Sequence, residues 1–135
     1  MRNIRPLMAA AVALLATGQA LADITIGASI SLTGPTLALG IPTRNGIELW
    51  PKSIASEKLN VIVLDDATDP TLGVKNARRF ISEDKVDVIV GSVATPIAAA
   101  MSDVATEGQT VQLMLSPVNL PEGRRGRSAC RNRPP

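Results

Sequence analysis

The chain has 135 residues, with 14 Lys or Arg against 12 Asp or Glu, a formal net charge of +2 at pH 7 and an apolar fraction of 45%. It contains no histidine, which excludes imidazole metal sites and the usual Ser/His or Cys/His nucleophile systems. The lone Cys130 cannot close an internal disulfide, and no Gly-rich phosphate-binding motif is present. These absences exclude most hydrolase mechanisms.

The first 22 residues have the three-part layout of a secretory signal peptide. Arg2 and Arg5 precede an apolar run from Leu7 to Ala16, and the small-residue ending Ala-Leu-Ala follows at 20–22. The alternative is a membrane anchor or a buried first helix, but ten apolar residues are too few for the ~20 that span a bilayer. We predict cleavage before Asp23 and a periplasmic or extracellular product that is not inserted in the membrane.

Charge divides the rest of the chain into two parts. Residues 23–121 hold seven Lys or Arg and eleven Asp or Glu, a net charge of −4, whereas residues 122–135 hold five Arg and one Glu, a net charge of +4. The basic pI of about 9.1 therefore comes from the two ends of the chain, and it does not indicate a nucleic-acid partner. Residues 23–121 are mildly acidic and read as one domain.

The first predicted elements are a strand and a helix. Residues 24–30 alternate apolar and small polar side chains and run into the turn residues Thr33-Gly34-Pro35, as a strand followed by a loop does. A helix lies within residues 37–50, where Pro42 and Pro51 restrict the continuous part and the last six residues are the safest stretch.

A second strand and helix follow. The apolar run Leu59–Leu64 predicts a parallel strand buried on both faces, and it ends at Asp65 and Asp66. Asp69 and Pro70 predict a helix start, because the aspartate accepts hydrogen bonds from free amides and proline has no amide to leave unpaired. The residues of this helix that we expect to face the core are Leu72, Ala77, Phe80 and Ile81.

The last predicted elements repeat this pattern. Residues 86–90 read as the third strand, which Gly91 ends, and Thr95-Pro96 opens a helix through about Glu107. Residues 111–115 read as the fourth strand. Strands that alternate with helices predict an α/β fold with a parallel, doubly wound sheet in the order 2-1-3-4.

In such sheets ligands bind beyond the carboxyl ends of the strands, where the order switches between strands one and three. That places the candidate site at residues 31–35 and 92–96. Ser92 and Thr95 offer hydroxyls beside the exposed amides of a helix start, an arrangement that favours an anion such as a ligand carboxylate. The alternative, which residue types alone favour, is that Thr95 caps its own helix and Ser92 fills a loop.

Three other features have structural and functional interpretations. Asp65 and Asp66 could hold a metal or act as a phosphorelay acidic pair, but the signal peptide opposes the second. Stabilisation of a loop, or a solvated position, is the favoured role of the pair. Trp50 and Phe80 lie on apolar helical stripes and are expected in the core rather than on a surface for stacking bases or sugars. Ser29, Ser31 and Thr33 share alternate-face spacing on strand one, which indicates no catalysis.

Four motifs stand in order along the chain. They are Leu32-Thr33-Gly34-Pro35 with Gly40, Leu64-Asp65-Asp66 before Asp69-Pro70, Val88-Ile89-Val90-Gly91-Ser92, and Leu115-Ser116-Pro117. As a set they resemble the first lobe of the periplasmic substrate-binding proteins of branched-chain amino acid ABC transporters, which are type 1 periplasmic binding proteins. The resemblance covers residues 24–121.

The resemblance implies a site and a function. Thr95 would supply the hydroxyl that holds the α-carboxylate of an amino acid, with Ser92 nearby, and the loop after strand four would line the site. The residues of that loop are Val118, Asn119 and Leu120. Leu39 stands where relatives often present a larger side chain to the ligand. The implied role is the periplasmic solute-binding component of an importer for branched-chain or related amino acids, with an ABC permease as partner. Such a role implies no enzyme activity, no cofactor and no metal.

The sequence departs from this pattern after residue 121. The resemblance implies a second lobe with the ammonium contacts, but residues 122–135 turn into a basic tail that we expect to be frameshifted or disordered. We therefore expect an amino-terminal fragment that does not function alone. The alternative is a small exported single-lobe α/β interaction domain whose basic tail contacts an acidic partner.

Overall fold

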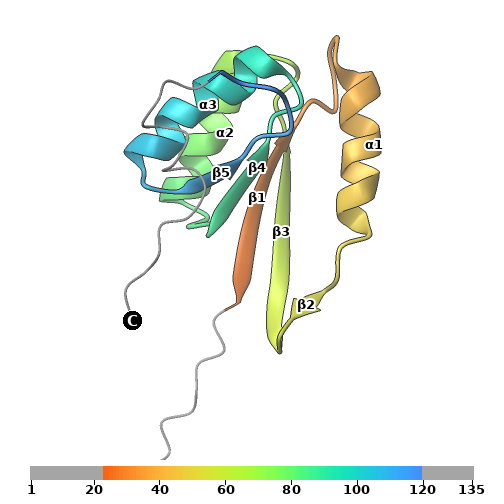
Figure 1. Ribbon diagram of the computed structural model, residues 1–135, viewed down its shortest axis with the longest axis vertical. Helices are drawn as coiled ribbons and strands as arrows, with labels where there is room; N and C mark the ends of the chain where they lie inside the picture. The colour runs from red at the N-terminus through yellow and green to blue at the C-terminus, as the bar shows by residue number, and fades with distance from the viewer. Residues whose placement is uncertain (1–22, 120–135) are drawn as a thin grey trace, which may run out of the picture.

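The computed structural model describes residues 23–119, in which strands and helices alternate in the predicted order. The predicted signal peptide (1–22), Leu120 and the basic tail (122–135) lie outside the described residues. The elements are β1 (Ile24–Ile30), α1 (Leu37–Glu48), β2 (Ser53–Ile54), β3 (Glu57–Asp65), α2 (Pro70–Ser82), β4 (Val88–Gly91), α3 (Thr95–Glu107) and β5 (Val111–Leu113), shown in Figure 1.

The strands form one sheet in the order β2-β3-β1-β4-β5. Strand β1 pairs in parallel with β3 and β4, and β4 pairs in parallel with β5. The predicted α/β fold and the order of its four parallel strands are confirmed. Strand β2 was not predicted; it is a two-residue antiparallel partner of the start of β3. The chain order reverses direction between β1 and β4, so the candidate site lies beyond the carboxyl ends of these two strands.

Helices cover both faces of the sheet, with α2 and α3 on one side and α1 on the other (Figure 1). The core under α2 and α3 includes the fully buried Phe80, Ile89 and Met101, as a helix pair with an apolar face against a sheet requires. The face under α1 has a smaller core, in which Ile30 and Ile47 are buried. No helix within residues 23–119 is long and apolar enough to cross a membrane.

Helix α1 begins at Leu37, as predicted, but differs from its prediction at Pro42 and at its carboxyl end. It runs through Pro42 without a break. Pro42 has no amide proton to donate to the carbonyl of Ala38, but both residues are exposed, so water can reach this carbonyl. The helix ends at Glu48, so the expected place of Trp50 on a helical stripe is wrong. Trp50 lies just past the helix, where its amide donates to the carbonyl of Ile47 at 3.0 Å, and it packs half-buried against the core under α1.

The expectation that Leu72 faces the core is also wrong, since this side chain is 37% exposed. The inward positions of α2 are Gly73, Ala77 and Phe80, which follow helical spacing. Helix α3 passes so close to Gly73 that an added Cβ there would collide with the side chain of Ile97. The crossing point of the two helices therefore turns Gly73 inward and leaves Leu72 at the side.

Two strands are shorter than predicted. Strand β4 begins at Val88 rather than Val86, because the amide of Val86 donates to the carbonyl of Phe80 at 3.0 Å and so belongs to the end of the preceding helix. Strand β5 ends at Leu113 rather than Leu115. Strand β3 is longer than predicted and begins at Glu57, where it pairs with β2.

Candidate functional site

Three loops meet at the carboxyl edge of the sheet. They follow β1, β3 and β4, and each leads into a helix. The start of α2 is as predicted: Asp69 accepts the amide of Thr71 at 2.7 Å, and Pro70 is the first helical residue. Helix α3 starts differently, since its cap residue is Ala94 and no side chain caps it.

Asp65 ties the loop after β1 to the end of β3. Its Oδ1 accepts the amides of Leu32 at 2.8 Å, Thr33 at 3.2 Å and Ala67 at 2.8 Å, and its Oδ2 accepts the Thr33 hydroxyl at 2.6 Å. Burial by itself would raise the pKa of Asp65, but the hydrogen bonds from the Thr33 hydroxyl and from the three amides favour the carboxylate and together lower that pKa below its ordinary value of 3.8.

Asp66 lies one residue further and is fully buried. Its Oδ1 accepts the Ser31 hydroxyl at 2.6 Å and the amide of Thr68 at 3.1 Å. Its Oδ2 accepts the hydroxyls of Ser92 at 2.8 Å and Ser29 at 3.4 Å. The interpretation that the acidic pair stabilises loops is therefore confirmed. Nowhere in residues 23–119 do three or more His, Cys, Asp or Glu side chains gather as ion ligands would.

Ser92 is the first residue of the loop after β4, and its side chain is fully buried. Its Oγ accepts the amide of Ala94 at 3.3 Å while its proton goes to Asp66. The preceding Gly91 has φ of +120°, and an added Cβ would collide with the carbonyl of Ser29, so only glycine fits between β4 and this loop. Ser92 thus fills and fixes the loop, as one of the two interpretations predicted.

Thr95 is exposed and is the first residue of α3. Its hydroxyl makes no hydrogen bond within residues 23–119, so the interpretation of Thr95 as the cap of its own helix is wrong. Sequence reasoning placed the cap one residue too late because Thr is a common cap residue and Ala is not. Within the described part of the chain, Thr95 therefore stands at a helix start with a hydroxyl that has no hydrogen-bond partner.

The other predicted site residues follow β5. Val118 is half-buried and Asn119 is exposed, and Leu120 is not among the described residues. Since β4 and β5 pair in parallel, their following segments leave the same edge of the sheet as neighbours. No hydrogen bond in the described part of the chain joins Thr95 to Val118 or Asn119.

The sequence analysis missed two polar side chains near this edge, the buried Gln112 and the half-buried Asn76. Gln112 is only 5% exposed, and its Nε2 donates to the carbonyls of Gly91 at 2.8 Å and Ala98 at 3.2 Å. Asn76 donates to Ser29 Oγ at 3.2 Å and to the carbonyl of Asp65 at 3.0 Å. A polar residue inside an otherwise apolar strand or helix face was the available signal for both, because buried polar groups require partners.

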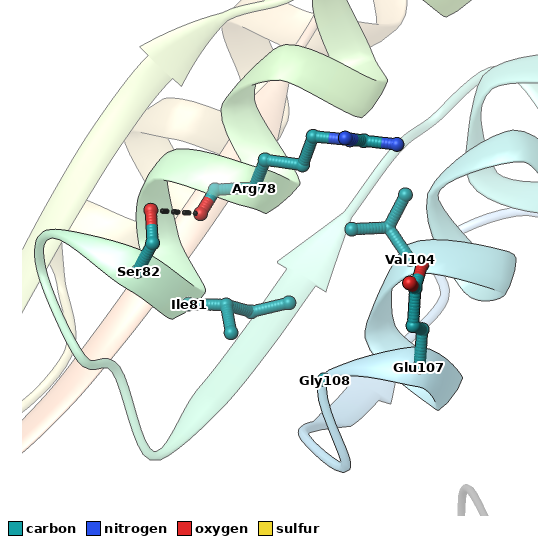
Figure 2. Close-up of a pocket in the computed structure, with 6 residues that line it drawn as sticks. All are labelled: Arg78, Ile81, Ser82, Val104, Glu107 and Gly108. Atoms are coloured by element: carbon teal, nitrogen blue, oxygen red, sulfur yellow. Dashed lines mark hydrogen bonds between the residues drawn. The ribbon is translucent and has the colours of Figure 1, made fainter.

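A pocket of about 380 Å³ lies elsewhere, between α2 and α3. Figure 2 shows the residues that line it, Arg78, Ile81, Ser82, Val104, Glu107 and Gly108. They belong to the carboxyl ends of the two helices, which in a parallel α/β unit lie at the edge opposite the carboxyl ends of the strands. This pocket is therefore separate from the candidate site.

Comparison with known proteins places these observations in a family. Residues 23–130 match the model of a family described as periplasmic binding protein. Over 104 residues the chain is 38% identical to Leu/Ile/Val-binding protein homolog 3 of Brucella melitensis, which covers 73% of this chain and 27% of the relative. It is 37% identical over 102 residues to Leu/Ile/Val-binding protein BraC3 of Rhizobium johnstonii, with 71% of this chain and 27% of the relative covered.

Solved structures agree. The protein Rp1789 of Rhodopseudomonas palustris is 48% identical, with a TM-score of 0.73 over 76% of this chain and 29% of the other. A solute-binding protein of an ABC transporter from Rhodopseudomonas palustris, solved with 3,4-dihydroxybenzoic acid, is 28% identical, with a TM-score of 0.69 over 78% of this chain and 30% of the other. The chain thus spans less than a third of the length of these relatives.

Proposed function

Because this chain belongs to the periplasmic binding protein family, whose members are solute-binding proteins rather than enzymes, we propose that it is the part of an ABC importer's binding protein that recognises the carboxylate of the ligand. The observation that carries this proposal is the exposed Thr95, whose hydroxyl has no partner within residues 23–119. It stands at the start of α3, beyond the switch point between β1 and β4.

The proposed contacts follow from the chemistry of a helix start. The amide end of α3 carries partial positive charge, which favours an anion there, and the Thr95 hydroxyl donates to one carboxylate oxygen. The loop after β5, with Val118 and Asn119, lines the other side of the ligand in this proposal. Ser92 supports this arrangement from below, through the loop that leads into α3.

A branched-chain amino acid is the first candidate ligand. The Brucella and Rhizobium relatives are named for binding Leu, Ile and Val, and in this chain Leu39, which is 58% exposed in the first turn of α1, offers an apolar wall. An aromatic acid is the second candidate, because a relative was solved with 3,4-dihydroxybenzoic acid. Phe80 is buried in the core and Trp50 lies past the far end of α1, so neither aromatic residue is placed to stack on such a ligand.

The remaining parts of the proposal rest on the family. Periplasmic binding proteins deliver solutes to a membrane permease, so we place this protein in the periplasm with an ABC permease as its partner. The relatives are more than three times as long as the segment they share with this chain. Tight binding in hinged binding proteins depends on closure of two lobes around the ligand, so the single lobe described here should bind weakly, with a dissociation constant of roughly millimolar or above.

Amide NMR spectra of the isotope-labelled chain test this proposal. Titration with L-leucine should move the amide signals of residues 93–98 and 116–119, apart from Pro96 and Pro117, which have no amide proton. Titration with L-leucinamide, which lacks the carboxylate, should leave these signals in place. A parallel titration with 3,4-dihydroxybenzoate separates the two candidate ligands. Equal effects of leucine and leucinamide, or changes confined to the pocket between α2 and α3, would contradict carboxylate recognition at α3.

A further inference from the structure

Asp66 is a buried carboxylate that the proposed ligand contacts do not use. It is 0% exposed, and it accepts hydrogen bonds from three segments that are far apart in sequence. These segments are β1 with its following loop, through Ser29 and Ser31, the loop after β3, through the amide of Thr68, and the loop after β4, through Ser92.

The direction of each hydrogen bond around Asp66 is determined. Asn76 Nδ2 and the amide of Ala94 can only donate, so Ser29 Oγ and Ser92 Oγ accept from them, and each serine hydroxyl donates its own hydrogen bond to Asp66. The Ser31 hydroxyl and the Thr68 amide also donate. The Asp66 carboxylate therefore accepts all four hydrogen bonds.

This network has a consequence for the loop that presents Thr95. The loop between Gly91 and α3 has three residues. Its last residue, Ala94, donates its amide to the hydroxyl of its first, Ser92, which in turn donates to the Asp66 carboxylate. The Ser92 hydroxyl donates its hydrogen bond to Asp66 and is buried, so it cannot donate to a ligand anion. Ser92 can nevertheless set where Ala94 and Thr95 stand.

We propose that Asp66 is a positioning residue that holds the loop after β4, through Ser92, in the conformation that presents Thr95 to the ligand. This inference rests on the proposed function for the role of Thr95, but not for the role of the network itself. It assigns Ser92 to the support of the site rather than to ligand contact. A buried network of this kind is sensitive to the loss of one member, because an unpaired buried group costs far more than its bond contributes.

Native-state hydrogen exchange of the labelled chain tests the network without any ligand. The variants are Asp66→Asn and Ser92→Ala, and the matched control is Ser102→Ala, which removes another buried serine of α3 whose hydroxyl donates to the carbonyl of Ala99. The measured quantity is the ratio of the amide exchange rate of Ala94 to that of Ile89 in the core. This ratio should rise about tenfold in Asp66→Asn and Ser92→Ala, and it should not change in Ser102→Ala. An unchanged ratio in Ser92→Ala overturns the proposal.

Two further measurements keep the result interpretable. If Asp66→Asn does not fold, Ser31→Ala is the substitute, because it removes a single hydroxyl donor from the same carboxylate. The amide NMR signals of Ala94 and Thr95 should shift in this variant, through Asp66. No shift overturns the proposal. Spectra of Ser92→Ala without and with L-leucine separate the two roles of Ser92. If the signals of the loop after β4 are altered before leucine is added, Ser92 positions the loop. If these signals are unaltered and the response to leucine is lost, Ser92 contacts the ligand and the positioning proposal is overturned. If leucine has no effect on the wild-type chain, the proposed function fails while hydrogen exchange still decides the network.

Discussion

Asp65 and Asp66 are adjacent in the chain, yet their carboxylates serve different loops. Asp65 is half-buried and bonds the backbone around Leu32 and Thr33, whereas Asp66 is fully buried and bonds the hydroxyls of Ser31 and Ser92. Alternation of side chains at the end of a strand explains this division, since successive residues point to opposite faces. Together the two residues connect all three loops of the candidate site.

The lowered pKa of Asp65 makes a prediction about acid stability. A carboxylate whose pKa is lower in the folded state stabilises the protein above its unfolded pKa of 3.8, and this contribution is lost as the pH falls from that value through the lower folded pKa. In Thr33→Ala, which removes the 2.6 Å bond to Asp65, the free energy of unfolding should be lower at neutral pH and should fall less on acidification below 3.8.

Urea unfolding at a series of pH values, followed by the fluorescence of the single tryptophan, Trp50, measures this dependence. The control is Thr43→Ala, which removes a hydroxyl bonded only to its own helix at the carbonyl of Leu39. Identical acid profiles for Thr33→Ala and the wild-type chain would show that Asp65 does not contribute as described.

At the scale of elements, the contact between α2 and the sheet sets the stability of the lobe. Phe80 is fully buried and its ring lies directly over Gly27 of β1, where an added Cβ would stand 2.6 Å from the ring. Phe80→Ala should therefore lower the free energy of unfolding by about 3–5 kcal/mol. Leu72→Ala on the same helix should lower it by less than about 1 kcal/mol, because Leu72 is 37% exposed.

Chemical denaturation of both variants gives the comparison directly. Losses of similar size would mean that Leu72 is in the core, as the sequence pattern first suggested, and that the described rotation of α2 is wrong.

These elements also show what sequence reasoning can reach. The start of α2 was predictable because Asp69 and Pro70 act on their own helix, and the strands were predictable from their apolar runs. The rotation of α2 was not, because it depends on where α3 crosses Gly73. Likewise the Ser92 hydroxyl could be placed near the site, but its direction depends on Asp66, which lies 26 residues away in the chain.

At the scale of the whole molecule, residues 23–119 form a sheet whose two faces are covered unequally. Helices α2 and α3 bury one face, while Val61 and Val63 remain half-buried under α1 alone. The chain spans 27% of the length of its Leu/Ile/Val-binding relatives. The central proposal is that these residues supply only part of a ligand site, namely the carboxylate contact through Thr95.

The most direct test places this lobe within the full-length chain of a relative. In a chimera, residues 23–119 of this chain replace the corresponding segment of BraC3 from Rhizobium johnstonii, and calorimetry measures the affinity for L-leucine. We predict that the chimera binds leucine and that Thr95→Ala weakens binding about 5- to 150-fold, the loss expected when a charged acceptor loses its donor. Thr110→Ala, at the opposite edge where its hydroxyl bonds the carbonyl of Gly108, should bind as the unmodified chimera does. A folded chimera that binds no leucine, or one whose affinity is unchanged by Thr95→Ala, would contradict the account.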